Sequence, residues 1–209
     1  VVGSSNSDVS SQSIVANIQK NKSSKVVIKD ALFGLPKLKP KTIKNSKSLE
    51  NQDIGFKFTK YNLKGSKFVD GLNNNSIDYL SNHINRYNNE RDVEIFNTLP
   101  QGENSLHNSI AHIMPYKNRN HIFKDKYFKL SEDRVSKTIT SHMKFDCNMY
   151  IHPTQARGLS PREAARIQTF PDDYVFMGAN NSWYAQIGNA VPVKLASVIG
   201  QQIIKNLND

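Results

Sequence analysis

The stretch Arg157–Pro192, RGLSPREAARIQTFPDDYVFMGANNSWYAQIGNAVP, contains the strongest structural signals of the chain. Ser160 fits the N-cap of a helix, Pro161 fits its first position, and Glu163 completes a capping box three residues on. We therefore expect a helix to begin at Pro161. Phe170-Pro171-Asp172 follows and is expected to stop it, because proline does not continue a helix.

The far end of this stretch, Gln186–Pro192, predicts a tight turn that leads into a last helix. Gly188 permits close backbone geometry there, and Pro192 sets the entry into the helix. The residues after Pro192 place apolar side chains at helical spacing, which predicts one continuous stripe that needs a partner surface. The stripe consists of Leu195, Val198, Ile199 and Ile203.

The charge of the chain favours a polyanionic partner. Its 209 residues carry a formal net charge of +10 and the sequence pI is about 9.6. Attraction to a nucleic acid would weaken as salt rises. A bias toward Lys and Asn codons is the alternative source of the charge. Hydrophobic residues make up 37% and mean hydropathy is −0.57, which is lean for a free-standing globule.

The chain contains one cysteine, Cys147, so an internal disulfide framework is excluded. His142, Cys147 and His152 are evenly spaced but lack a fourth ligand, and we expect no metal site. No apolar run is long enough for a membrane span, and no signal peptide is present. Val1-Val2-Gly3 resembles the end of a buried strand, so we expect one piece of a larger or split protein.

The remainder of the chain predicts a mixture of helix and short strands. Residues 4–24 and 37–53 are rich in polar residues and are expected to be loop or exposed. Ser81–Leu99 has helical apolar spacing and ends before Pro100. Residues 116–150 alternate aromatic or β-branched residues with polar ones, which predicts small strands joined by polar loops.

Several of these segments together resemble the DNA (cytosine-5)-methyltransferases. Leu159–Asp172 resembles the ninth conserved motif of that family, and Gln186–Pro192 resembles the tenth. Arg91–Asn104 and Ser136–His152 are similar to the target-recognition region of its bacterial restriction-modification members. Lys25–Leu38 resembles the linker that follows the eighth motif.

The resemblance implies an α+β fold. It consists of a small DNA-recognition domain of short strands and loops, plus C-terminal helices that complete a Rossmann-like methyltransferase domain supplied elsewhere. The expected divisions are residues 1–80 as the end of a catalytic-domain strand and a partly disordered linker, 81–175 as the target-recognition domain, and 176–209 as a turn and helix that dock on the catalytic domain.

The family's catalytic and cofactor-binding motifs are absent from these residues. There is no Phe-x-Gly-x-Gly cofactor loop, no Pro-Cys and no Glu-Asn-Val. We therefore expect no catalytic residue here, an ordinary thiol at Cys147, and no methyl transfer by the chain alone. The resemblance implies double-stranded DNA and an N-terminal methyltransferase half as partners, no membrane, S-adenosyl-L-methionine as a shared cofactor, and a cytoplasmic protein associated with the nucleoid.

The candidate DNA contacts lie in the loops between residues 116 and 145. An enzyme that extrudes a base must hold the duplex through phosphate contacts and read it through groove contacts. A solvated basic face is the alternative for each cation. By resemblance, Thr138 and Ile139 match a Thr-(Leu/Ile/Val) pair that touches DNA backbone, and a locally satisfied strand residue is the alternative. The candidate cations are Lys117, Arg119, Lys137 and Lys144.

The remaining candidates serve the cofactor or the framework. By resemblance, Asn189, Ala190 and Val191 wall the cofactor and cytosine pocket, and a purely structural turn is the alternative. A structural role is expected for Gly188 and Pro192 and, as buried or half-buried ion pairs, for Arg157, Arg162, Glu163 and Arg166. The competing functions are a stand-alone sequence-specific DNA-binding protein and a non-functional remnant.

Overall fold

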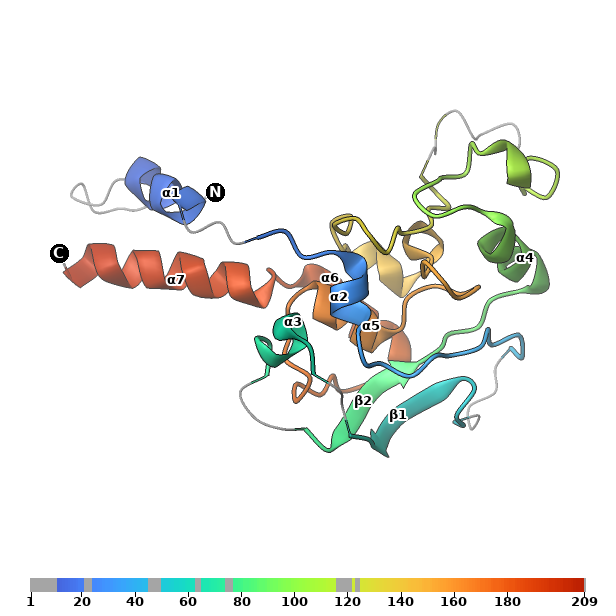
Figure 1. Cartoon of the computed structure of the whole chain (residues 1–209), viewed down its shortest axis with the longest axis horizontal. Helices are drawn as coiled ribbons and strands as arrows, with labels where there is room; N and C mark the ends of the chain where they lie inside the picture. Colours follow the sequence, from blue (N-terminus) through green and yellow to red (C-terminus); the bar gives the residue numbers. More distant parts are fainter. Residues whose placement is uncertain are drawn as a thin grey trace. The chain divides into compact units, whose positions relative to one another are not determined.

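The computed structural model describes residues 11–20, 24–44, 50–62, 65–73, 77–115, 122 and 125–208. The chain divides into two compact units: a large unit of residues 26–189, and a terminal unit of residues 1–25 with 190–209. Helices and strands are mixed in the large unit (Figure 1). Among the described residues, no helix has the length and apolarity needed to cross a membrane.

The elements of the large unit are α2 (Ile28–Leu32), β1 (Gly55–Lys60), α3 (Lys67–Asp70), β2 (Tyr79–Ile84), α4 (Glu90–Thr98), η1 (Asn108–Ile110), η3 (Ser141–Lys144), η4 (Asn148–Tyr150), α5 (Pro161–Ile167) and α6 (Asn180–Asn189).

The strands β1 and β2 form an antiparallel pair in which Phe56 lies opposite His83 and Lys60 opposite Tyr79. Asn82 has a φ of 55° within β2. Its side-chain amide donates to the Phe176 carbonyl at 3.0 Å and accepts from the Phe176 amide at 2.9 Å. The side chain of Asn82 therefore replaces the backbone partner that Phe176 would find in a third strand.

The helix predicted over Ser81–Leu99 is wrong in its first part. Ser81–Ile84 belong to β2, and α4 begins only at Glu90, where the Asn89 side chain accepts from the Asp92 amide at 2.8 Å. A helix through residues 81–84 would lose the backbone pairing with β1. The apolar spacing that predicted one helix comes from two different elements.

The main core cluster lies around α4 and combines aliphatic and aromatic side chains from segments far apart in sequence. Polar groups at its edge are paired. The Tyr127 hydroxyl donates to the Asp92 carboxylate at 2.7 Å, and the Lys129 ammonium donates to the Phe96 carbonyl at 2.9 Å. The buried members are Ile95, Phe96, Leu99, Ile110, Met114, Tyr127 and Ile151.

The short strands predicted between residues 116 and 150 are not found in the described part of that segment. Residues 125–150 instead contain the short turns η3 and η4 and isolated bridges, such as the parallel bridge of Lys129 with Ile151. Each of these bridges is isolated and pairs one residue of each segment, so no regular strand forms there. Alternation of apolar and polar residues therefore overestimated the regular strand structure of this segment.

The helix start at Pro161 is confirmed. The Ser160 hydroxyl accepts from the Glu163 amide, the Glu163 carboxylate accepts from the Ser160 amide, and Pro161 occupies the first turn. The helix ends at Ile167, ahead of the predicted stop at Phe170. Thr169 adopts a φ of 59°, a left-handed conformation that ends the helical path.

Of two predictions about the ends of the chain, one changes and one is confirmed. Ser11–Lys20 forms the helix α1, although the polar composition of residues 4–24 predicted a loop. α1 packs along α7 (Val193–Asn208) and buries Ile14, and such packing favours a helix that the polar composition alone does not indicate. The last helix is confirmed as α7, and the Pro192 carbonyl accepts from the Ala196 amide at 2.9 Å.

The predicted turn over Gln186–Pro192 is partly wrong. Gln186–Asn189 form the last turn of α6, so Gly188 is helical and the chain leaves the helix only after Asn189. The stripe on α7 remains partly exposed within the terminal unit. Leu195 is 44% exposed and Ile203 is 37% exposed, while Val198 and Ile199 are half-buried.

Candidate nucleic-acid interface

Arg157 and Glu163 form a fully buried ion pair at the start of α5. The two guanidinium nitrogens of Arg157 donate to the Glu163 carboxylate at 2.7 and 2.6 Å. Burial raises the pKa of Glu163, but the charge and hydrogen bonds of Arg157 outweigh it, and the net pKa lies below the usual value. The same carboxylate caps the Ser160 amide at 2.7 Å, so the pair fixes the loop before α5 to the helix.

Arg166 and Asp172 form a second buried pair, with nitrogen–oxygen distances of 2.7 and 2.9 Å. Arg166 also donates to the Phe33 carbonyl at 2.6 Å, which ties α5 to the end of α2. The expectation that Arg157, Glu163 and Arg166 form buried ion pairs is confirmed. Their link to a hinge between domains stays a prediction.

Arg162 differs from these two arginines because most of its partners are uncharged. It donates to the Ser81 carbonyl at 3.0 Å, the Ser81 hydroxyl at 2.6 Å and the Tyr174 carbonyl at 2.6 Å. Burial lowers the pKa of Arg162 to about 10 against the raising effect of Asp172. Arg162 therefore joins β2 and the segment after α5 into one framework.

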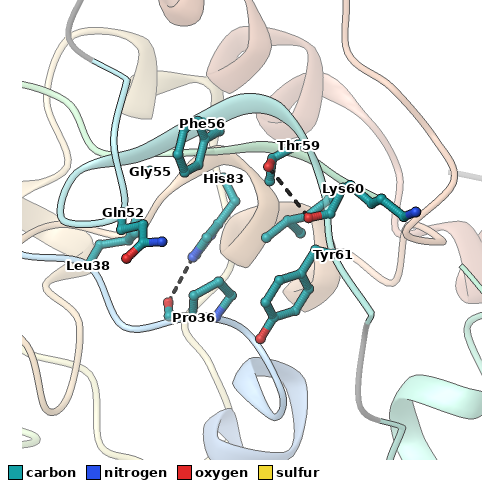
Figure 2. Close-up of a pocket in the computed structure, with 10 residues that line it drawn as sticks. Pro36, Leu38, Gln52, Gly55, Phe56, Thr59, Lys60, Tyr61 and His83 are labelled. Atoms are coloured by element: carbon teal, nitrogen blue, oxygen red, sulfur yellow. Dashed lines mark hydrogen bonds between the residues drawn. The ribbon is translucent and has the colours of Figure 1, made fainter. Parts of the chain in front are cut away.

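His83 adds a further connection that the sequence did not reveal. Its Nδ1 lies 2.9 Å from the Ser160 hydroxyl and its Nε2 lies 2.9 Å from the Pro36 carbonyl. Burial lowers the pKa of His83 to about 4, so the ring is neutral near pH 7. A neutral ring protonated on Nε2 satisfies both contacts. The side chain therefore links β2 to the N-cap of α5 and to the segment after α2. Figure 2 shows its hydrogen bond with Pro36.

Gly188 brings α6 into contact with the segment that follows Thr138 and Ile139. A Cβ on Gly188 would overlap the Thr140 carbonyl group and the Ser141 amide nitrogen. The glycine is needed for this close backbone contact and not for an unusual φ angle. The two motifs singled out in the sequence for different roles therefore lie side by side in the large unit.

The Thr138–Ile139 pair is divided by burial. Thr138 is exposed, whereas Ile139 is 4% exposed and packs inward. The Tyr150 hydroxyl donates to the Thr138 carbonyl at 2.8 Å and lies 3.1 Å from the Thr140 hydroxyl. The structure holds Thr138 in a fixed position at the surface and leaves little of Ile139 for a ligand to contact. DNA contact by the pair stays a prediction.

Arg86 holds the turn at residues 143–145, after the Thr138–Ile139 pair, through hydrogen bonds to its carbonyls. The sequence pattern did not identify Arg86. Its guanidinium donates to the Met143 carbonyl at 2.8 Å and the Phe145 carbonyl at 2.9 Å, and it lies 5.3 Å from the ring centre of Tyr184 in α6. The partners are 57 or more residues away, so no local pattern could have identified them. Arg86 holds residues 143–145 against α6.

Cys147 also contacts Arg86, whose guanidinium lies 3.7 Å from the Cys147 sulfur. It is fully buried, and burial raises the pKa of its thiol against the lowering effect of Arg86. A thiol that is buried and protonated is a poor nucleophile, since the thiolate is the reactive form. The geometry supports an inert structural cysteine.

The candidate cations have unequal surroundings. Lys144 is exposed, and its ammonium lies 4.8 Å from the ring centre of Phe145, which is itself 65% exposed. The Lys137 ammonium pairs with the Asp125 carboxylate at 3.1 Å and lies 4.6 Å from the Phe128 ring centre. Lys117 and Arg119 lie outside the described residues.

The candidate cofactor residues end α6 and follow it. Asn189 is the last residue of α6 and is exposed. Ala190 and Val191 belong to the terminal unit, and Val191 is 54% exposed. Among the described residues, no further side chain joins these three to enclose a cofactor. Their contact with a cofactor therefore stays a prediction.

Comparison with known proteins gives one consistent result. The model of the C-5 cytosine-specific DNA methylase family matches residues 10–205. A type II methyltransferase of Bacillus paralicheniformis is 30% identical over 204 residues, covering 92% of this chain and 44% of the relative. Another, from Psychrobacter sp., is 49% identical over 80 residues, covering 38% of this chain and 19% of the relative.

A solved structure has a similar fold. It belongs to a protein assigned as a DNA modification methyltransferase encoded within a prophage (E. coli), with a TM-score of 0.59 and 22% identity. The match covers 89% of this chain and 48% of that one. The chain spans less than half the length of the curated relatives and the solved structure that it matches.

Proposed function

The chain belongs to the family of C-5 cytosine-specific DNA methylases, and we propose that it supplies the DNA-positioning and DNA-reading part of a type II DNA (cytosine-5)-methyltransferase. In this proposal the segment 137–145 contacts the duplex. The buried framework around α5 keeps that segment in place, and α6 joins it to the part of the enzyme that carries out the chemistry.

The close contact of Gly188 with Thr140 and Ser141 carries the proposal. It joins the segment after Thr138 directly to α6, while Arg86 donates to the Met143 and Phe145 carbonyls. A surface held by these contacts, which presents a hydroxyl, an exposed lysine and an exposed aromatic ring, is suited to holding a duplex in register. The net charge of +10 supplies the long-range attraction.

Chemistry at the cytosine is assigned to residues outside this sequence. The 209 residues contain no Pro-Cys and no Glu-Asn-Val motif, and the single thiol, that of Cys147, is buried. We therefore propose an N-terminal methyltransferase half as the partner, with a Rossmann-like sheet that α6 and α7 complete. The proposed divisions remain residues 1–80, 81–175 and 176–209.

S-adenosyl-L-methionine, when bound, would supply the methyl group. Of this chain, Asn189, Ala190 and Val191 are proposed to contribute one wall of its pocket. Three consecutive residues without a glycine-rich loop or a carboxylate do not enclose a cofactor by themselves. The contribution of the chain is to hold DNA and to complete the wall, and not to activate the methyl group.

Duplex binding by the full chain tests the proposal. We expect log affinity to fall linearly with log salt concentration, with a slope of roughly one per phosphate contacted. Lys144→Gln should weaken binding and reduce the slope by about one. The matched control is Lys39→Gln, which removes the same formal charge from a lysine paired with Asp53 at 3.1 Å.

The comparison of the two variants distinguishes a specific DNA surface from non-specific attraction of DNA to a basic protein. If Lys39→Gln and Lys144→Gln weaken duplex binding equally, the segment 137–145 is not the DNA surface. Co-expression with an N-terminal methyltransferase half then tests the enzyme role, because a stand-alone DNA-binding protein would not restore methylation. We expect labelled methyl transfer by the pair and none by the chain alone.

A further inference from the structure

A cavity of about 360 Å³ lies in the large unit between the β1–β2 pair and the segment after α2. Its volume falls in the range typical of small-molecule sites, about 300–1,000 Å³. None of the residues of the segment 137–145 lines it. Figure 2 shows its lining residues gathered around His83. They are Pro36, Leu38, Gln52, Gly55, Phe56, Thr59, Lys60, Tyr61, Leu80 and His83.

The walls are mainly aromatic and aliphatic. Phe56 and Tyr61 lie on either side of His83 in Figure 2, with Pro36 beneath it. The Tyr61 hydroxyl lies 3.1 Å from the Gly34 carbonyl, to which it donates, so this ring is held in place. Rings and a proline around an open space suit a flat, weakly polar ligand body.

The formal charge of the cavity lining is positive and comes from an exposed side chain. Lys60 carries the formal charge among the lining residues, and as far as the structure describes the walls, no Asp or Glu is part of them. His83 is neutral near pH 7, since burial lowers its pKa to about 4, and both of its ring nitrogens have partners. A ligand that uses the whole site would therefore combine a flat ring with an anionic group.

We propose that this cavity binds one unpaired nucleotide, with its base against the aromatic rings that line the cavity, Phe56 and Tyr61, and its phosphate at Lys60. Aromatic side chains beside a cation are the groups by which proteins hold unpaired nucleotides. The proposal rests on the proposed DNA-holding function for the source of the nucleotide, which is a strand of the bound DNA. A free nucleotide presents the same chemistry.

Fluorescence titration of the full chain with 2-aminopurine deoxyribonucleoside monophosphate tests the cavity directly. We expect saturable quenching of the probe. Lys60→Gln should weaken binding about fivefold for the monophosphate and leave the corresponding nucleoside unchanged, because the phosphate contact is exposed. Phe56→Leu should weaken both probes by about tenfold through loss of stacking.

The matched control is Lys57→Gln, on the same strand but outside the cavity lining. It should leave the affinity for the monophosphate unchanged. Absence of saturable quenching, or equal losses in Lys57→Gln and Lys60→Gln, would overturn the proposal. Displacement of the probe by a short single-stranded oligonucleotide, and not by the same sequence in a duplex, would identify a DNA strand as the source. Displacement by free nucleotides alone would retain the site and assign it to a free ligand.

The two proposals fail separately in this design. Lys144→Gln probes duplex binding and lies outside the cavity, whereas Lys60→Gln and Phe56→Leu probe the cavity. Duplex binding that depends on Lys144 without any binding of the nucleotide probe overturns the cavity alone. Nucleotide binding without duplex binding overturns the proposed DNA-holding function.

Discussion

The region around α5 and the segment 137–145 are both rich in cations, yet they use them in opposite ways. Arg157, Arg162 and Arg166 are fully buried, and their charges are matched by carboxylates or backbone carbonyls. In the segment 137–145, Lys144 lies at the surface, and Arg86 holds the turn from beneath. Formal charge in the sequence therefore overstates the charge available at the surface, because part of it is buried in the framework.

The largest effect that would sharpen this contrast is expected from Glu163→Gln. The substitution leaves the buried guanidinium of Arg157 without its carboxylate, and breaking one partner of a buried pair costs about 3–5 kcal/mol. Denaturant unfolding followed by circular dichroism measures the loss. The control is Asp133→Asn, which breaks the exposed pair with Lys29 at 2.6 Å and should change stability far less. Equal losses in the two variants would contradict a structural role for the buried pair.

Gly188→Ala should have the next largest effect. The added Cβ overlaps backbone atoms of Thr140 and Ser141, which cannot rotate away, and such overpacking costs about 1–3 kcal/mol. Gly200→Ala is the matched control, since no heavy atom apart from its chain neighbours and the backbone of its own helix would lie within 4 Å of the added Cβ. Because alanine favours helices over glycine, the control should be neutral or stabilising by up to about 1 kcal/mol. A tolerated Gly188→Ala would show that α6 and the 137–145 segment do not need their close contact.

Acidification should lower the stability of the buried framework through its two neutral histidines, His83 and His152. Burial lowers the pKa of His83 to about 4 and that of His152 to about 3, so the unfolded chain binds more protons as pH falls below about 6.5. Stability is therefore full above that pH and decreases on acidification. Between pH 6.5 and 5.5, the two groups together should cost about 2 kcal/mol.

Unfolding curves at several pH values measure this decrease. His83→Gln should reduce the pH dependence by about half, whatever its effect on stability at pH 7. A stability that is constant from pH 7 to 5.5 would mean that these rings are not buried in their neutral form.

Arg86→Lys should have the smallest of these effects, about 1 kcal/mol, because the charge remains while the planar fork to two carbonyls is lost. The expected consequence is local. Hydrogen exchange of the Ser141–Lys144 amides should become faster, and duplex affinity should fall along with it. Faster exchange of these amides with unchanged duplex affinity would show that the turn held by Arg86 does not contribute to DNA binding.

The capping box at Ser160 and the stripe on α7 were predictable because both are local. Each depends on residues three or four positions apart, whose geometry a helix fixes by itself. The family was also identifiable from the order of its motifs, without any contact between them. The prediction of buried arginine pairs succeeded because their partners lie within six residues along α5 and its flanks.

The missed features depend on residues far apart in sequence. Asn82, His83 and Arg86 form one polar stretch, and each side chain is satisfied by groups 47–94 residues away. Backbone pairing with β1, outside the predicted helix, turned the first part of the predicted helix over Ser81–Leu99 into β2. Likewise, α1 packs along α7 and buries Ile14, and the polar neighbours of Ile14 do not reveal this packing.

By itself, the sequence determined the family, the start of α5, the last helix and the absence of the family's cysteine loop from these residues. Tertiary structure alone decided which cations are buried, that Gly188 brings α6 against Thr140, and that an aromatic cavity opens beside His83. The physical reason is the range of the interactions. Helix caps and apolar periodicity act within one turn, whereas burial and close backbone contact exist only after distant segments have packed together.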